Sequence, residues 1–274
     1  RRGLHELNLS SIQADPSRGR TRERRSLFQT VAAWDRDIPR FARMRPALSC
    51  LEWVSSRGWA KDLAALSFIL ACVLVFFKDA ILFGNVYWEP DTLTYYYPAT
   101  RQLDDALARG TLQLWTPYIF GGFFLYADGE TGTFYIPKLL MLLLFSAEQE
   151  LVWLRVLRFF LAGLFTYYFA RQINLSRYSA TLAALVFSLG SFLVAKLHHS
   201  NLGNTAIWLP LILLLVEKSF VSLGFRRYAY IALGGLALGM ASLAVHVQPV
   251  VLIILTVGCY ALFRAFTVPT GRPS

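Results

Sequence analysis

Long apolar runs separated by shorter polar segments dominate the chain from residue 63 onwards. About 20 apolar residues in a helix are needed to cross a hydrocarbon core ~30 Å thick. The pattern therefore predicts six membrane-spanning helices. They lie at about 63–84, 151–170, 178–195, 202–216, 228–245 and 250–266, of which the fourth is short and contains Pro210.

The segment between the first two predicted spans, residues 85–137, is far longer than a connection requires. Loops of this length are usually functional or disordered, and the many aromatic residues here argue against disorder. Pro98 and Gly110 bracket an amphipathic pattern that predicts a helix along the outer membrane surface. Residues 139–145 are apolar but too few to cross, so we expect a re-entrant or interfacial helix. Six aromatic residues of the loop are expected at headgroup depth: Trp115, Tyr118, Phe120, Phe123, Phe124 and Tyr126.

The ends of the chain have a different character. Residues 1–62 form a basic region, which we expect to be cytoplasmic and partly disordered, with residues 1–26 the least ordered. Residues 27–44 have helical apolar spacing among arginines, as in a helix lying on anionic lipid or one packed against the rest of the protein. Residues 267–274 would be a cytoplasmic tail, and we expect the chain to be part of a longer protein.

Composition and charge favour a membrane protein over a soluble one. Hydrophobic residues make up 55% and charged residues 16% of the chain, and the mean hydropathy is +0.45. The net charge is +10, but roughly half of the 27 Lys and Arg precede Asp62, which indicates a cytoplasmic N-terminus and a membrane rather than a nucleic acid as partner. We predict an all-α, polytopic integral membrane protein with residues 85–137 outside the cytoplasm. Further cytoplasmic ends would carry Arg171, Arg177, Arg226, Arg227, Arg264 and Arg272.

Candidate chemistry collects on the outer face in this topology. No glycine-rich phosphate loop, nucleophile elbow or HExxH motif is present, so a group donor would have to come from the membrane. A carboxylate among aromatic rings can act as a general base, and Asp91 is the first choice. The alternative is that Asp91, which follows Pro90, only forms a turn. The other candidates on this face are Glu89, Tyr95, Trp115, Asp128, Glu130, His198, His199 and His246.

Several of these residues have more than one interpretation. Arg155 and Arg158 share a helix face and would either hold a lipid phosphate or pair with Glu148 or Glu150. His198 and His199 would bind phosphate, relay a proton or simply lie in a wet interfacial loop, and His246 would bind substrate or only mark a turn. A divalent metal bridging Asp91 and Asp128 is a further option.

A run of motifs in order resembles the N-terminal half of the YfhO-like bacterial membrane proteins. These motifs are YWEPDTLTYYYP, LWTPYIFGG, ADGETGTFYIP, LAGLFTYYFARQINLSR and ALVFSLGSFLVAKLHHSN, within residues 63–266. That family belongs with the GT-C glycosyltransferases, so the resemblance implies a GT-C-like transmembrane domain over 63–266 in a bacterial cytoplasmic membrane. It also implies transfer of a sugar from a polyprenyl-phosphate donor to a glycan or lipid acceptor, with Asp91 at the position of the family's acidic residue.

Two other functions remain open from the sequence. A transporter or lipid flippase would also carry intramembrane charges and glycine-rich spans, in which Gly235 and Gly239 form a pair suited to close helix packing. A non-catalytic scaffold would use the aromatic loop to bind a partner.

Overall fold

The computed structural model describes residues 58–84, 90–112, 114–126, 128, 130–197 and 199–267. Residues 54–274 form one compact unit, and the description below concerns that unit alone. The predicted disorder of residues 1–26, the predicted helix at 27–44 and the predicted tail lie outside the described residues.

Helices account for nearly all regular structure in the described residues, and the only β-pairing among them is an isolated bridge between Thr116 and Phe123. The all-α prediction is confirmed. The helices are α3 (Gly58–Phe76), α4 (Lys78–Phe83), the π-helix η1 (Thr92–Tyr96), α5 (Tyr97–Ala108), α6 (Ile136–Leu144), α7 (Ala147–Gln172), α8 (Arg177–Ser188), α9 (Ser191–Ala195), α10 (Ser200–Ala206), α11 (Trp208–Val221), α12 (Phe225–Leu243) and α13 (Val247–Thr267).

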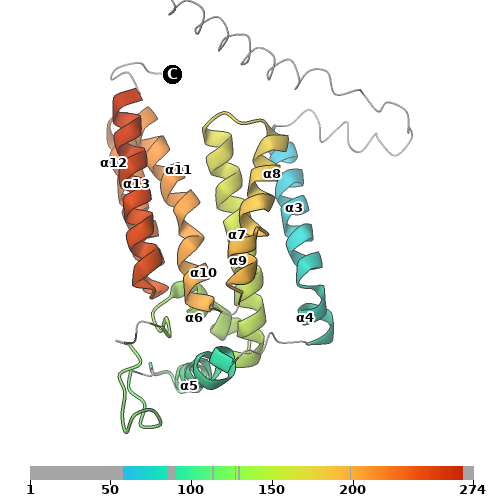
Figure 1. Ribbon diagram of the computed structural model, residues 1–274, viewed down its shortest axis with the longest axis vertical. Coiled ribbons are helices and arrows are strands. Elements are labelled where there is room, and N and C mark those ends of the chain that lie inside the picture. Colours follow the sequence, from blue (N-terminus) through green and yellow to red (C-terminus); the bar gives the residue numbers. More distant parts are fainter. Residues whose placement is uncertain are drawn as a thin grey trace, which may run out of the picture. The chain divides into compact units, whose positions relative to one another are not determined.

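Five segments in the described part of the chain are long and apolar enough to cross a membrane. They are α3, α7, α8 with α9, α10 with α11, and α13. The fifth predicted span, 228–245, corresponds to α12, a helix of 19 residues that packs on α11 and α13 and runs beside them (Figure 1). It is not one of the five, because Arg226 and Arg227 in its first turn lower its mean hydropathy.

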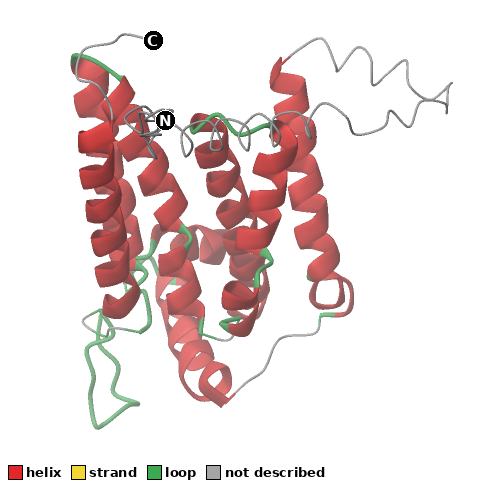
Figure 2. Cartoon of the chain, turned by 45° about the horizontal axis from the view of Figure 1, so that its top comes forward, coloured by secondary structure: helices red, strands yellow, loops and turns green. Residues whose placement is uncertain are grey.

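The long helices alternate in direction, so their ends fall into two groups (Figures 1 and 2). The start of α3, the α7–α8 and α11–α12 turns and the end of α13 lie at one end of the bundle. We call this the arginine end, because Arg171, Arg177, Arg226, Arg227 and Arg264 lie there. The opposite end, which we call the loop end, carries α4, α5, α6 and the turns at 196–199 and 244–246.

Close packing of α7 holds the bundle together. The central apolar cluster draws on α7 together with α3, α11, α12 and α13. At Gly163 of α7 an added Cβ would lie 2.7 Å from Ile69 Cγ2 of α3, so the small residue permits this contact. The prediction that Gly235 and Gly239 allow close helix packing is wrong, because an added Cβ at either position would meet no described residue within 4 Å.

Ionic pairs at the arginine end join helices that are distant in sequence. Asp62 of α3 accepts hydrogen bonds from Arg177 Nε (2.7 Å) and from the Tyr167 hydroxyl (2.6 Å). Glu217 of α11 pairs in the same way with Arg264 of α13. Asp62 and Glu217 therefore join helices at this end through pairs with arginines.

The segment that follows η1 forms the base of the loop end. Helix α5 lies across the direction of the bundle helices (Figure 1), and its predicted existence is confirmed. Tyr97 donates a 2.6 Å hydrogen bond to Glu148, and Asp104 accepts one of 3.2 Å from the Ala147 amide. Because both partners lie in the first turn of α7, α5 is fixed to the start of that helix.

Candidate functional site

A π-helical turn positions the first candidate, Asp91. The residue caps the N-terminal end of η1, where its backbone is helical, and η1 continues directly into α5. Single π-turns are rare and occur often at functional sites. The Asp91 side chain is 63% exposed, so it can meet a solute from outside. The sequence alternative, in which Asp91 only forms a turn after Pro90, does not describe this conformation.

Asp91 borders a partly open cavity of about 670 Å³ at the loop end, which we call the outer cavity. Its charged lining in the described residues consists of three carboxylates and two histidines, with neither Lys nor Arg. The lining residues are Asp91, Tyr95, Tyr96, Phe120, Phe123, Asp128, Glu130, His199, Asn201, Leu202 and His246. Six sequence candidates from four separate segments thus meet in one cavity.

His199 lies beside Asp91 in the outer cavity. Its Nδ1 lies 4.0 Å from Asp91 Oδ2, and its side chain is 31% exposed. His246 borders the same cavity from the turn between α12 and α13, and its Nδ1 is buried without a hydrogen-bond partner among the described residues. An acid and two imidazoles therefore border one space.

Tyr95 holds a second acid on the cavity wall. Its hydroxyl donates a short hydrogen bond to Asp128, and its ring packs edge-on against Tyr96 at 5.5 Å between centroids. Burial, and after it the bond to Asp128, raises the pKa of Tyr95 above its usual value. Tyr95 therefore remains a donor that fixes one oxygen of Asp128.

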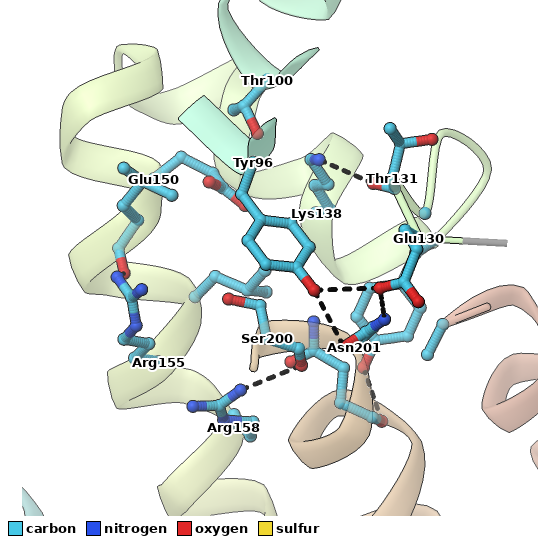
Figure 3. A pocket seen from close by; sticks show the side chains of 16 residues that line it. Tyr96, Thr100, Glu130, Thr131, Lys138, Glu150, Arg155, Arg158, Ser200 and Asn201 are labelled. Atoms are coloured by element: carbon cyan, nitrogen blue, oxygen red, sulfur yellow. Dashed lines mark hydrogen bonds between the residues drawn. The ribbon is translucent and has the colours of Figure 1, made fainter. Parts of the chain in front are cut away.

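Three hydrogen-bonded residues separate the outer cavity from a deeper chamber, and we call them the partition (Figure 3). The Tyr96 hydroxyl donates to Glu130 Oε2 (3.0 Å) and to Asn201 Oδ1 (3.3 Å), and Asn201 Nδ2 donates to Glu130. Burial, and after it Glu130, raises the pKa of Tyr96. All three residues line both spaces, so a substitution of Glu130 would alter both the outer cavity and the inner chamber.

The inner chamber has a volume of about 30 Å³, which suffices for one or two water molecules. Its lining is strongly polar although it is deep in the protein. The polar and charged side chains are Tyr96, Thr100, Glu130, Thr131, Tyr135, Lys138, Glu150, Arg155, Arg158, Ser200, Asn201 and Asn204 (Figure 3).

Sequence reasoning gave Lys138 of this chamber no role, and it considered Glu150 only as an alternative partner of the two arginines. Lys138 of α6 is 7% exposed and donates a 2.8 Å hydrogen bond to the Thr131 carbonyl, and burial lowers its pKa. Glu150 is 2% exposed, and its Oε1 has no hydrogen-bond partner in the described part of the protein. Buried polar groups of this kind usually bond to ordered water, for which the chamber has room. A lysine within the apolar stretch IPKLLMLLL was the available signal.

Arg155 and Arg158 lie in the same chamber, 2% and 1% exposed. Arg158 donates to the carbonyls of Ser200 (2.9 Å) and Leu197 (3.2 Å), and Arg155 Nε donates to Leu197 (3.1 Å). Neither arginine lines the outer cavity. The two residues predicted to hold a lipid phosphate are thus bound to backbone oxygen atoms.

The remaining predicted site residues lie elsewhere. Trp115 lines neither cavity. It packs on Gly122, where an added Cβ would lie 2.6 Å from Trp115 Cζ2, in a tight turn closed by two 2.8 Å hydrogen bonds between Thr116 and Phe123. Glu89 and His198 lie outside the described residues. The described residues contain no group of three or more His, Cys, Asp or Glu that could hold a metal ion.

Comparison of the sequence with known protein families identifies the family of this chain. The family model described as "Bacterial membrane protein YfhO" matches residues 64–238, which include α7, the partition, and every described candidate except His246. Searches of curated proteins and of solved structures each gave no match. Because the family model covers more than half of the chain, the protein belongs to the YfhO family of bacterial membrane proteins.

Proposed function

We propose that the protein transfers a sugar from a polyprenyl-phosphate donor to a hydroxyl group of a glycan or lipid acceptor. The observation that carries the proposal is the outer cavity, in which Asp91 lies 4.0 Å from His199 and His246 borders the same space of about 670 Å³. Ligand pockets commonly enclose about 300–1,000 Å³, so a sugar ring has room here. Family membership supports the proposal through the link of YfhO-like proteins to GT-C glycosyltransferases.

Asp91 acts as the general base in this reaction. Its carboxylate accepts the proton of the acceptor hydroxyl while that oxygen forms a bond to the anomeric carbon of the donor sugar. The bond between the anomeric carbon and the phosphate oxygen breaks, and its electron pair leaves with the polyprenyl phosphate. His199 and His246 donate hydrogen bonds to the departing phosphate, since they are the nitrogen bases that border the outer cavity.

The aromatic and carboxylate lining suits a sugar. Hydroxyl groups bond to Asp128 and Glu130, and the rings of Phe120 and Phe123 present apolar faces to the carbon side of a pyranose. The polyprenyl chain would remain in the bilayer beside the bundle, where many large apolar side chains are exposed.

The reaction takes place on the outer face of the bacterial cytoplasmic membrane. Arginines gather at the end of the bundle opposite the outer cavity, and the positive-inside rule assigns that end to the cytoplasm. Residues before α3 would then be cytoplasmic, and the donor would be presented from the outer leaflet.

Replacement of Asp91 by Asn tests the proposal directly. Asn keeps the shape of Asp91 but cannot accept the proton, so we expect transfer to fall by about a hundredfold or more. The assay uses the purified full chain in vesicles with a panel of radiolabelled polyprenyl-phosphate hexoses and measures label in acceptor glycans or lipids. Asp79→Asn is the matched control, because Asp79 is an exposed carboxylate at the same end of the bundle but lies outside both cavities.

Three results would contradict the proposal. The first is full transfer by the Asp91→Asn variant. The second is an equal loss in both variants. The third is movement of the polyprenyl lipid between leaflets by the unmodified protein without any sugar transfer, which would support a flippase.

A further inference from the structure

We propose that Arg155 and Arg158 are positioning residues that fix the turn between α9 and α10, and through it His199 and Asn201 of the site. We call residues 196–199 the α9–α10 turn. The inference concerns the geometry of the site, and its main readouts need no catalytic turnover. It therefore stands or fails separately from the proposed function.

The two arginines bind the backbone where two helices meet. A helix end leaves carbonyl oxygens without helical partners, and a cationic side chain there is favoured by hydrogen bonding and by the helix dipole. Leu197, two residues after the end of α9, offers its carbonyl to both Arg155 Nε (3.1 Å) and Arg158 Nη2 (3.2 Å). Arg158 Nη1 also binds the carbonyl of Ser200, the first residue of α10, at 2.9 Å. One side chain of α7 thus spans the turn from one helix to the next.

The α9–α10 turn and the start of α10 carry much of the site. His199 is the turn residue whose Nδ1 lies 4.0 Å from Asp91. Asn201 follows Ser200 and bonds to Glu130 and Tyr96 in the partition, while Leu202 lines the outer cavity. A displacement of the carbonyls held by the arginines would move these side chains with the backbone.

The surroundings of Arg158 leave it little freedom to serve another ligand. Its side chain is 1% exposed, and an added Cβ on Gly203 of α10 would lie 2.7 Å from its Nη1. The guanidinium therefore packs against a backbone without a side chain and is directed to the turn. To bind a phosphate in the outer cavity, it would have to leave both carbonyls and pass the partition.

The experiment compares Arg158→Met, Arg158→Lys and Arg264→Met in the full chain, purified in lipid nanodiscs. Arg264 is the control, because it is a partly buried arginine that pairs with Glu217 at the arginine end. The first readout is hydrogen–deuterium exchange of residues 196–206. The second is the ring chemical shift of His199 in histidine-labelled protein, where four histidines give few signals to assign.

Arg158→Met is expected to accelerate exchange in residues 196–206 about tenfold or more and to shift the His199 signal, because the turn loses the two hydrogen bonds that Arg158 donates to Leu197 and Ser200. Arg158→Lys should bring both the exchange rate and the His199 signal part of the way back to the wild-type values, since a lysine can reach one carbonyl. Arg264→Met should change exchange only in α11 and α13. If Arg158→Met does not fold, Gly203→Ala gives the same test, because its Cβ displaces the guanidinium without removing the charge.

Two outcomes would overturn the inference. Wild-type exchange and an unshifted His199 signal in a folded Arg158→Met or Gly203→Ala variant would show that the turn does not depend on the arginine. Weaker binding of polyprenyl phosphate by Arg158→Met, with exchange unchanged, would show a phosphate ligand instead.

Discussion

The outer cavity and the inner chamber share one wall but use charge in opposite ways. The outer cavity is wide, and its acid Asp91 is 63% exposed. The inner chamber is small, and its arginines are bound to carbonyls at 1–2% exposure. A buried charge requires compensation and becomes part of the framework, whereas an exposed acid beside a cavity remains available to a substrate. Burial and partners, rather than residue type, separate the two roles.

Replacement of Lys138 gives the largest expected difference in stability between the inner chamber and the outer cavity. Lys138→Met removes a buried, charge-assisted hydrogen bond to Thr131 and one of the cations near Glu150, so we expect a loss of about 2–4 kcal/mol in the free energy of unfolding. Asp128→Asn in the outer cavity should cost less than about 1 kcal/mol, because Asn can still accept the bond from Tyr95. Unfolding of both variants by a denaturing detergent measures the difference, and equal losses would mean that the chamber is no more structural than the cavity.

Glu130 tests whether the partition serves both spaces. Glu130→Gln retains the size of the side chain and one oxygen that can accept the bonds from Tyr96 and Asn201, but it removes the negative charge that strengthens them. The weakening of bonds to a charged group corresponds to about a tenfold decrease in sugar transfer. Transfer and unfolding should both be measured in vesicles or nanodiscs. A stability loss like that of Lys138→Met, with unchanged transfer per folded molecule, would assign Glu130 to the framework alone.

The tyrosines give the smallest effect, which is confined to high pH. The pKa values of Tyr95 and Tyr96 are raised in the folded protein, so the unfolded chain releases these protons first, from about pH 10. Their contribution to stability is complete below that pH and is lost as the pH rises. Ultraviolet titration should show less tyrosinate at pH 11 in the wild type than is expected for free tyrosines. Tyr95→Phe and Tyr96→Phe should each remove a group that ionises late, and ordinary ionisation of both residues would refute the interpretation.

Sequence periodicity predicted the helices because helix formation and membrane crossing depend on local composition. It also predicted that Asp91, His199 and His246 lie on the same membrane face, because alternating spans place alternate connections on the same side. The contacts of Arg155 and Arg158 could not be predicted in this way. They depend on free carbonyls after α9, a helix preceded by Gly190, where an added Cβ would lie 2.2 Å from the Val186 carbonyl. The role of Lys138 likewise depends on the path of the loop at Thr131, which follows from no local pattern.

The wide winding of η1 makes the site sensitive to the number of residues in one turn. If the stretch from Thr92 to Tyr96 kept its five residues but tightened into an ordinary α-helix, the preceding residues would rotate about the helix axis by about 100°, the rotation of one residue. Asp91 would then turn away from His199, while Tyr97 would stay bonded to Glu148 at the start of α7. A change of winding of this kind would leave all the side chains of the outer cavity in the protein and still disrupt the cavity.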